Sequence, residues 1–401
     1  MGFGLTDTWL CKAMRHYDFD WIRNIIIINL IPLHVTWLMI FIPDFSQVST
    51  TSLTALLLKG HLGFVSSWHM PMLFLIAGYS AAASLSKRSI RRYYVERVQR
   101  LLVPLITFMV TLGPIQRYFW PTYLGHRNLT DFATNHLPIY FGTLLNGSCG
   151  AYRWGPRWDH LWFIAYLFVI NITALAILIR INRSRIVAIA NSLRRHIVLL
   201  PMIGFGGIMA TLGYRWPLFN CQTLFQDWGY FSYNLWAFVI GYLMYAAPHL
   251  NQAIREKSRL WYVLFFVSSI IRFVFLNEYQ EGFYEDHSSL GRYLFFSALT
   301  GIHTWSAIST VLTLAYRYLA KTTNPCLNYL SKASLPIYIL HYPISIILGS
   351  YITALGLKII PEFLVMNAFT VLFTLLIYEL LIKPWPLVQR LLGMKPRKNQ
   401  P

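Results

Sequence analysis

Residues 21–37 read WIRNIIIINLIPLHVTW, an apolar run that begins beside an arginine and carries a histidine deep inside it. With its neighbours the run approaches the length of about 20 residues that crosses a bilayer as a helix. Of the 401 residues, 56% are hydrophobic and 12% are charged, whereas soluble proteins carry about 25% charged residues. We therefore predict an all-α, polytopic transmembrane helix bundle, because lipid offers no partner for backbone N–H and C=O groups.

Apolar runs of membrane length predict about ten spans. They cover residues 24–42, 63–85, 101–120, 160–179, 197–214, 228–246, 260–277, 293–316, 334–355 and 361–382. The chain then divides into an N-terminal segment at 1–23, a membrane domain at 24–382 and a basic tail at 383–401. We expect no cleaved signal peptide, because the first apolar run is long and lacks a small-residue cleavage site.

The distribution of the net charge of +19 predicts the orientation. If the loops alternate between sides, 25 of the 34 basic residues fall on one side and 8 on the other, with Arg272 inside a span. The positive-inside rule makes the basic side cytoplasmic, so we expect both termini there, in a bacterial cytoplasmic membrane. Membrane lipid is then a partner of the basic loops, and nucleic acid is not.

Arg23 and His34 are eleven residues apart, which is three helical turns and ~16 Å of rise. Both side chains should therefore lie on one face of the first span. A histidine at this depth is costly, so it is either functional or hydrogen-bonded to a neighbouring helix. Burial favours the neutral imidazole, which can act as a general base. Arg23 alone is more typical of a charge that anchors the helix end at the interface.

The longest predicted outer segment, residues 121–159, is rich in aromatic side chains and includes Trp154 and Trp158. It is too long for a simple connector, so it either covers a site or forms an aromatic belt at the interface. The four cysteines lack the spacing of a metal site, and we expect no metal. We expect unpaired thiols, with a Cys149–Cys221 disulfide as the less favoured alternative.

Five segments in order carry a resemblance to a known family. They are YDFDWIRNIIIINLIPLH (17–34), WHMPMLFLIAGYSAAASL (68–85), YYVERVQRLLVP (93–104), HLWFIAYLFVI (160–170) and ASLPIYILHYPI (333–344). Together they resemble the acyltransferase-3 family of integral membrane acyltransferases, most strongly at the first three segments. The resemblance implies ten core spans and transfer of acetyl, succinyl or other acyl groups to extracytoplasmic glycans. It also implies cytoplasmic acyl-coenzyme A as the donor substrate, with no permanently bound cofactor.

The resemblance assigns roles to residues of the reaction site and of the donor site. His34 matches the family's essential histidine and Arg23 its paired arginine. Arg97 and Arg100 match a cytoplasmic R-x-x-R pair, three residues apart on one helix face. Guanidinium groups make forked hydrogen bonds to phosphate, so this pair, with Arg92 nearby, is expected to bind the coenzyme A phosphates.

The remaining candidates belong to the acceptor side. His160 and His341 match histidines that recur in this branch of the family. We group them with Trp68, Trp154 and Trp158 as acceptor-binding candidates, since aromatic rings can cover the apolar face of a sugar. The span that begins at His160 starts with the sequence HLWF (160–163) and contains no glutamate. In both respects the chain resembles the branch of the family that contains glucan succinyltransferases.

Two chemical routes stay open at this point. His34 takes the proton of the acceptor hydroxyl, or His34 is itself acylated first. The candidates for an oxyanion donor are Trp68, His69 and the backbone at Gly78. A polytopic transporter of a glycan or lipid is the rival function. Apart from Glu362 at the edge of the last span, Glu379, near an inner end, is the only acid in the middle and late spans, and this scarcity argues against proton coupling.

Overall fold

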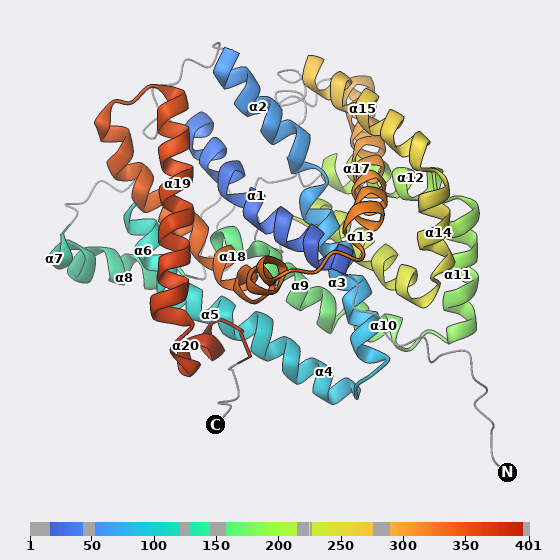
Figure 1. The fold of residues 1–401 in the computed structure, drawn as a ribbon, viewed down its shortest axis with the longest axis horizontal. Coiled ribbons are helices and arrows are strands. Elements are labelled where there is room, and N and C mark those ends of the chain that lie inside the picture. Colours follow the sequence, from blue (N-terminus) through green and yellow to red (C-terminus); the bar gives the residue numbers. More distant parts are fainter. Residues whose placement is uncertain are drawn as a thin grey trace.

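The computed structural model describes residues 17–42, 53–120, 128–144, 158–214, 224, 227–275 and 289–395. Throughout these residues the chain consists of helices and connecting turns, with no strand (Figure 1). The prediction of an all-α protein is therefore confirmed. The Cys149–Cys221 alternative and Trp154 lie outside the described residues.

The α-helices follow in chain order: α1 (Tyr17–Phe41), α2 (Leu53–Ser66), α3 (His69–Leu85), α4 (Ile90–Arg97), α5 (Val103–Val110), α6 (Leu112–Tyr118), α7 (Leu129–Asp131), α8 (Leu137–Gly142), α9 (Trp162–Ile172), α10 (Ala174–Leu178), α11 (Arg183–Arg195), α12 (Leu199–Ile208), α13 (Trp228–Ala246), α14 (His249–Glu256), α15 (Ser258–Val274), α17 (Leu290–Leu319), α18 (Pro325–Ile352), α19 (Ile359–Ile377) and α20 (Pro386–Leu391). Short π-helical stretches continue several of them: η2 (Val98–Leu102), η3 (Phe132–His136), η5 (Met209–Gly213) and η7 (Tyr378–Ile382). Two 3₁₀ turns are η4 (Asp159–Leu161) and η6 (Thr353–Leu355).

Within the described ranges, five helical segments are long and apolar enough to cross a membrane: Tyr17–Phe41, Leu53–Leu85, Asp159–Leu178, Pro325–Leu355 and Ile359–Ile382. The number is seven if each of two bent pairs is counted as one span: Ile90–Val110 with Leu112–Tyr118, bent by 44°, and Ser184–Arg195 with Leu199–Gly213, bent by 97°. A polytopic membrane protein is thus supported.

The other three predicted spans coincide with α13, α15 and α17, which do not satisfy the same measure of length and composition. The number of ten spans and the cytoplasmic position of both termini stay predictions.

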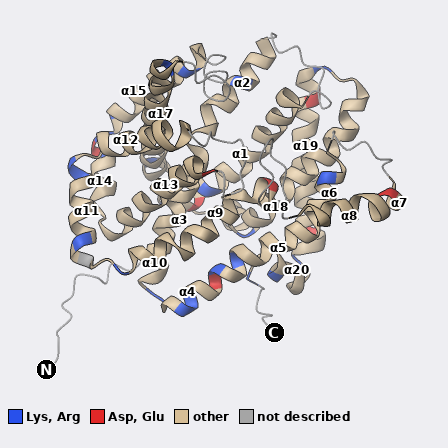
Figure 2. Cartoon of the chain, turned by 180° about the vertical axis from the view of Figure 1, so that it is seen from behind, with Lys and Arg blue, Asp and Glu red and all other residues tan. Residues whose placement is uncertain are grey.

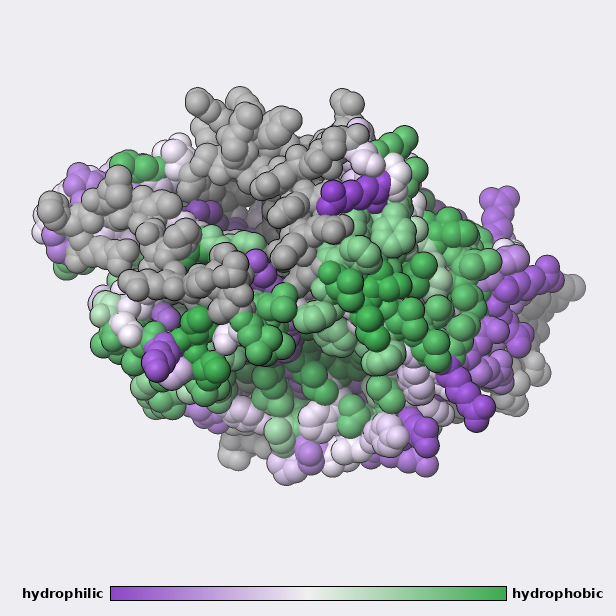
Figure 3. Space-filling model, turned by 90° about the horizontal axis from the view of Figure 1, so that it is seen from above, coloured by the Kyte–Doolittle hydropathy of each residue, from purple (hydrophilic) through white to green (hydrophobic). Residues whose placement is uncertain are grey.

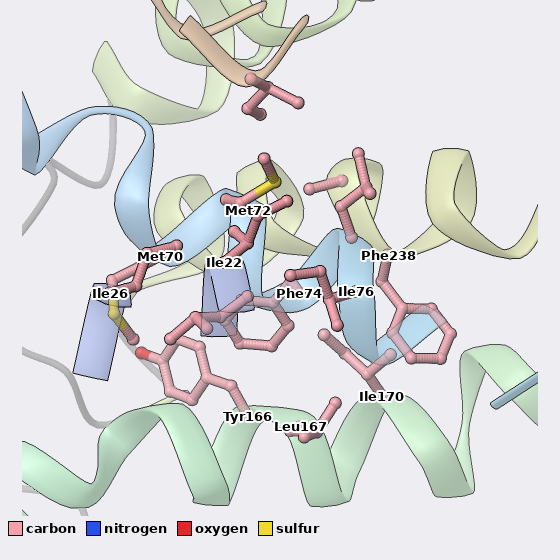
Figure 4. Packing of buried hydrophobic residues seen from close by; sticks show 14 of the residues in the cluster. Ile22, Ile26, Met70, Met72, Phe74, Ile76, Tyr166, Leu167, Ile170 and Phe238 are labelled. Carbon is pink, nitrogen blue, oxygen red and sulfur yellow. The ribbon is translucent and has the colours of Figure 1, made fainter. Parts of the chain in front are cut away.

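The core lies where α1, α3, α9 and α13 meet. Figure 4 shows apolar side chains from all four helices packed together: Ile22, Ile26, Met70, Met72, Phe74, Ile76, Tyr166, Leu167, Ile170 and Phe238. None of these side chains is more than a few per cent exposed. The buried core therefore holds α1, which carries Arg23 and His34, in a fixed place against its neighbours.

Glycines let α3 and α13 approach at backbone distance. A Cβ on Gly78 would lie 2.0 Å from the carbonyl oxygen of Phe238, and a Cβ on Gly241 would lie 1.9 Å from that of Leu75. No side chain fits there, so the crossing depends on glycine from both helices. Small residues at such crossings are typical of membrane helix pairs, whose association relies on close packing.

Basic side chains gather on the segments predicted to be cytoplasmic. Residues 86–100, which connect the predicted spans 63–85 and 101–120, largely form α4 and the start of η2. The basic segment 180–196 contains the amphipathic helix α11. Figure 2 shows Lys and Arg along α4 and at α11. In α11 the buried residues Ile186, Ala190 and Leu193 recur at helical spacing, whereas α4 buries Tyr93 and leaves Ile90 exposed.

Reporter fusions test the orientation. A reporter that is active only outside the cytoplasm should be silent when fused after residue 92 and active when fused near residue 140, because the positive-inside rule keeps α4 inside. Immunoblots of each fusion control for expression. The reverse pattern would overturn the orientation.

Candidate functional site

Three histidines from distant parts of the sequence meet between α1, α9 and α18. His34 lies in α1, His341 lies in α18, and His160 lies in the 3₁₀ turn that leads into α9. His160 and His341 are buried, and His34 is half-buried. A hydrogen bond of 3.0 Å from the Asn24 side chain to Ser331 Oγ links α1 to α18 and fixes the register of the two helices.

His34 and His341 form a hydrogen bond of 2.8 Å between His34 Nδ1 and His341 Nε2. The other nitrogen of His341, Nδ1, lies 3.0 Å from the carbonyl oxygen of Ile337. A carbonyl oxygen only accepts, so Nδ1 of His341 carries the proton, and neutral His341 accepts at Nε2. His34 then donates from Nδ1. This order of donors leaves Nε2 of neutral His34 as an unprotonated acceptor.

Pro343 explains how His160 is held. Its ring nitrogen lacks the N–H that would bond to the carbonyl of Ile339 four residues earlier. His160 Nε2 donates to that carbonyl instead, at 3.1 Å. The neutral ring then has an unprotonated Nδ1, which is buried and makes no hydrogen bond to the described residues. His160 therefore offers an acceptor to a donor group that enters the cluster.

Two tyrosines of α18 complete the cluster and were missed by sequence reasoning. The ring of Tyr342 lies 4.5 Å from that of His34 and 5.1 Å from that of His160, between ring centroids. The hydroxyl of Tyr338 donates to the backbone carbonyl of His160 at 2.7 Å. Their neighbour Pro343 was visible in the sequence, but the packing of α18 on both α1 and α9 was not.

An ion pair stabilises the backbone turn that contains His160. Arg117 of α6 binds the carboxylate of Asp159, which directly precedes His160. Asp159 has a φ of 44°, in the left-handed region that residues other than glycine rarely adopt. Such strain persists only where surrounding contacts hold it, and it often occurs at functional sites. The ion pair thus stabilises the turn that orients the His160 ring toward α18.

The predicted basic site lies apart from the histidines, toward α4. Arg23 pairs with Asp20 at 3.1 Å and keeps a side chain that is 35% exposed. The guanidinium of Arg97 stacks over Tyr93 at 4.7 Å from the ring centroid. Arg100 is exposed and lies close enough to Arg97 and Arg23 for their charges to act on it. The structure therefore gathers these three arginines on one side.

Two details modify the predicted phosphate site. Arg92 lies 3.8 Å from Glu96, a carboxylate that also pairs with Arg88 and Lys395. The positive charge of Arg92 is thus partly compensated by Glu96. Arg100 lies in the π-helical stretch η2, where i→i+5 bonding widens the turn, so it does not align with Arg97 as it would in an α-helix.

Trp68 and Trp158 both have contacts of their own within the protein. The indole N–H of Trp68 donates to the carbonyl of Phe64 at 2.8 Å, so it is already used and is not a ready oxyanion donor. Trp158 is 7% exposed within the main apolar cluster, so it offers little free ring surface.

The other oxyanion candidates also have structural contacts. His69 is buried, with Nδ1 2.8 Å from the carbonyl of Val65. Gly78 lies in the interior of α3, where backbone N–H groups bond within the helix. The described residues include no group of three or more His, Cys, Asp or Glu placed to hold a metal ion.

Comparison with known proteins identifies the family. Residues 16–379 match the family model described as an acyltransferase domain, a range that contains the histidine cluster and the three gathered arginines. The chain belongs to the acyltransferase-3 family. As a member of this family it is a membrane acyltransferase, and the rival assignment as a transporter loses its basis.

Relatives of this acyltransferase match along nearly their whole length. It is 25% identical over 405 residues to glucans biosynthesis protein C of Shigella dysenteriae serotype 1, covering 96% of each chain. It is 24% identical to the protein of the same name from Escherichia coli strain K12, again covering 96% of each chain. No solved structure matches it.

Proposed function

We propose that the protein transfers an acetyl- or succinyl-like group from cytoplasmic acyl-coenzyme A to a hydroxyl of an extracytoplasmic glycan. The observation that carries this proposal is the His34–His341 hydrogen bond, which leaves a neutral His34 with a free acceptor nitrogen inside an acyltransferase domain. The relatives are named for the biosynthesis of glucans, which favours a glucan as the acceptor class.

The donor is a long polyanion with a thioester at the end of a flexible arm. Its phosphates would bind Arg97 and Arg100, with Arg23 nearby and a smaller contribution from the partly compensated Arg92. Because α1 is one helix from Tyr17 to Phe41, it connects Arg23 to His34 over ~16 Å of rise. An arm of extended length would follow this helix toward the histidines.

At the histidine cluster, Nε2 of His34 would take the proton of the acceptor hydroxyl as its oxygen attacks the thioester carbonyl. The C–S bond then breaks, and the coenzyme A sulfur leaves with the proton returned from His34. His341 would hold the His34 ring in the required tautomer and share the positive charge that forms on it. In the alternative route, His34 Nε2 attacks the thioester carbonyl, and the C–S bond breaks with loss of the coenzyme A thiolate. The acceptor oxygen then attacks the acyl group, the C–N bond to His34 breaks, and the proton of the acceptor hydroxyl passes to the thiolate or to the freed imidazole.

Acceptor binding would involve His160, His341 and the aromatic side chains around them. His160 Nδ1 provides an acceptor for a sugar hydroxyl, and Tyr342 provides a ring beside His34. Trp68, Trp154 and Trp158 stay candidates for the outer wall of this route. In the proposed arrangement, donor and acceptor approach the histidines from opposite faces of the membrane.

Replacement of Arg97 and Arg100 tests donor binding. Each Arg→Ala change should remove a charge-assisted hydrogen bond worth roughly 1.5–3 kcal/mol, or about 10- to 100-fold in affinity for acyl-coenzyme A. Arg→Lys should restore only part of it, because an ammonium group cannot make the forked contact. Arg194→Ala, which removes the same charge from α11, is the matched control. If the double variant Arg97→Ala/Arg100→Ala and the control Arg194→Ala bind acyl-coenzyme A with equal affinity, the assignment of Arg97 and Arg100 to the donor site is refuted.

Reconstitution tests the reaction itself. Purified protein in oriented liposomes, given acetyl- or succinyl-coenzyme A on the cytoplasmic face and a glucan on the other, should release coenzyme A thiol and form glucan esters in equal amounts. Ester formation only when both substrates share one face would contradict the two-sided arrangement. Glucan movement across the bilayer without ester formation would contradict acyl transfer.

A further inference from the structure

A cavity lies away from the histidine cluster, between α2, α15 and α17. Its volume is about 710 Å³, within the range of small-molecule sites. The walls are mostly apolar, with aromatic side chains such as Phe64 and Phe265. Gly60 contributes to the lining and lets α2 approach α15, since a Cβ there would lie 2.8 Å from the Phe273 ring.

The cavity wall also carries a buried cation, on the helix that coincides with the predicted span at 260–277. Arg272 of α15 lines it with a side chain that is 3% exposed, and His303 of α17 lines it beside Arg272. His303 is fixed by Ser268 Oγ at 3.1 Å from Nδ1 and by the Phe64 carbonyl at 3.3 Å from Nε2. Intramembrane arginines are rare and typically face a cavity or a binding site. The five N–H donors of Arg272 can serve protein and ligand groups together.

The cavity opens onto the apolar outer face of α15. Three of its lining residues, Phe266, Ile270 and Phe273, are also exposed, Phe266 by 67%. Seen from above, hydrophobic side chains form a broad green face on the right of centre, in the region of α15 (Figure 3). In a membrane protein such a face contacts lipid, so a ligand can enter the cavity sideways from the bilayer.

We propose that this cavity binds an anionic phospholipid, with its phosphate at Arg272 and one acyl chain along the aromatic walls of α2 and α15. Charge complementarity favours the anionic head, because a guanidinium binds phosphate with two parallel hydrogen bonds. Continuity with the lipid-facing surface favours an acyl chain as the apolar part. The site uses none of the residues assigned to acyl transfer, so it does not depend on the proposed reaction.

Thermal unfolding of the full-length purified protein, titrated with phosphatidylglycerol or phosphatidylcholine, tests the site. Phosphatidylglycerol should stabilise the wild-type protein at much lower concentration than phosphatidylcholine. Arg272→Gln should weaken the phosphatidylglycerol response about 10- to 100-fold, the loss of a charge-assisted contact. Arg259→Gln, an exposed position on the same helix, should leave it unchanged and serves as the charge control.

A second variant keeps the test decisive if Arg272→Gln folds poorly. Ile270→Trp retains the guanidinium but fills the cavity from its exposed rim, and it should weaken the response to phosphatidylglycerol. Equal responses of the wild-type protein to the two lipids would overturn the proposal. So would full stabilisation by inorganic phosphate alone, or an unchanged response in both Arg272→Gln and Ile270→Trp.

Discussion

His34→Ala should lower the rate of acyl transfer by about 10²- to 10⁴-fold, the contribution of a positioned general base. The expectation follows from the donor order in the cluster: Ile337 accepts from His341, His341 accepts from His34, and Nε2 of His34 is left to take a proton. Alanine removes that nitrogen and leaves the packing of α1 on α18 largely in place. Initial rates of ester formation by purified enzyme, at equal amounts of folded protein, give the measurement.

Variants at His341 separate chemistry from structure. His341→Gln retains a side-chain acceptor for the His34 Nδ1–H, whereas His341→Leu does not. We expect His341→Gln to keep more of kcat than His341→Leu, with similar KM for acyl-coenzyme A in both. His196→Ala at the exposed end of α11 controls for loss of a histidine as such. Full activity of well-folded His34→Ala would remove His34 from the reaction.

Gly241→Ala should greatly reduce the amount of folded protein. The added Cβ would lie 1.9 Å from the backbone carbonyl oxygen of Leu75, and a backbone atom cannot move aside as a side-chain end can. α3 and α13 must therefore separate, which costs about 1–3 kcal/mol or more. Because these helices hold the core around α1, loss of their contact should also reduce activity in proportion to folded protein.

Gly207→Ala is the matched control for that change. Gly207 lies in α12, and a methyl group added there would have nothing within 4 Å, so the position has room for the same addition. There the higher helix propensity of alanine should leave stability unchanged or raise it by roughly 0.5–1 kcal/mol. Size-exclusion profiles after heating in detergent compare the two variants. Equal stability of Gly241→Ala and Gly207→Ala would show that the crossing is looser than the structure has it.

The sequence was sufficient to predict most of the architecture of α1. Its apolar length predicted a membrane helix, and the eleven-residue spacing placed Arg23 and His34 along one helix, as found. Helical periodicity carries this information because it acts within one segment. The basic segments 86–100 and 180–196 were assigned to one side by counting charges, which carries no information on helical structure. Only Arg97 and Arg100 were expected to lie on a helix.

Contacts between distant segments could not be predicted in the same way. The resemblance supplied His160 and His341 as candidates, but their meeting with His34 depends on how α18 packs against α1 and α9. The partial compensation of Arg92 by Glu96 and the burial of Trp158 likewise arise from packing. Tyr342 gave no sequence signal beyond its place between His341 and Pro343.

Mass spectrometry of envelope glycans tests the central claim most directly. Three strains are compared: one lacking the protein, one expressing the wild-type chain, and one expressing His34→Ala at matched abundance in the membrane. We predict ester-linked acyl groups on a glycan in the wild-type strain alone, with the unmodified glycan still made in the other two. Identical acylation in all three strains, or in the wild-type and His34→Ala strains, would contradict acyl transfer through His34.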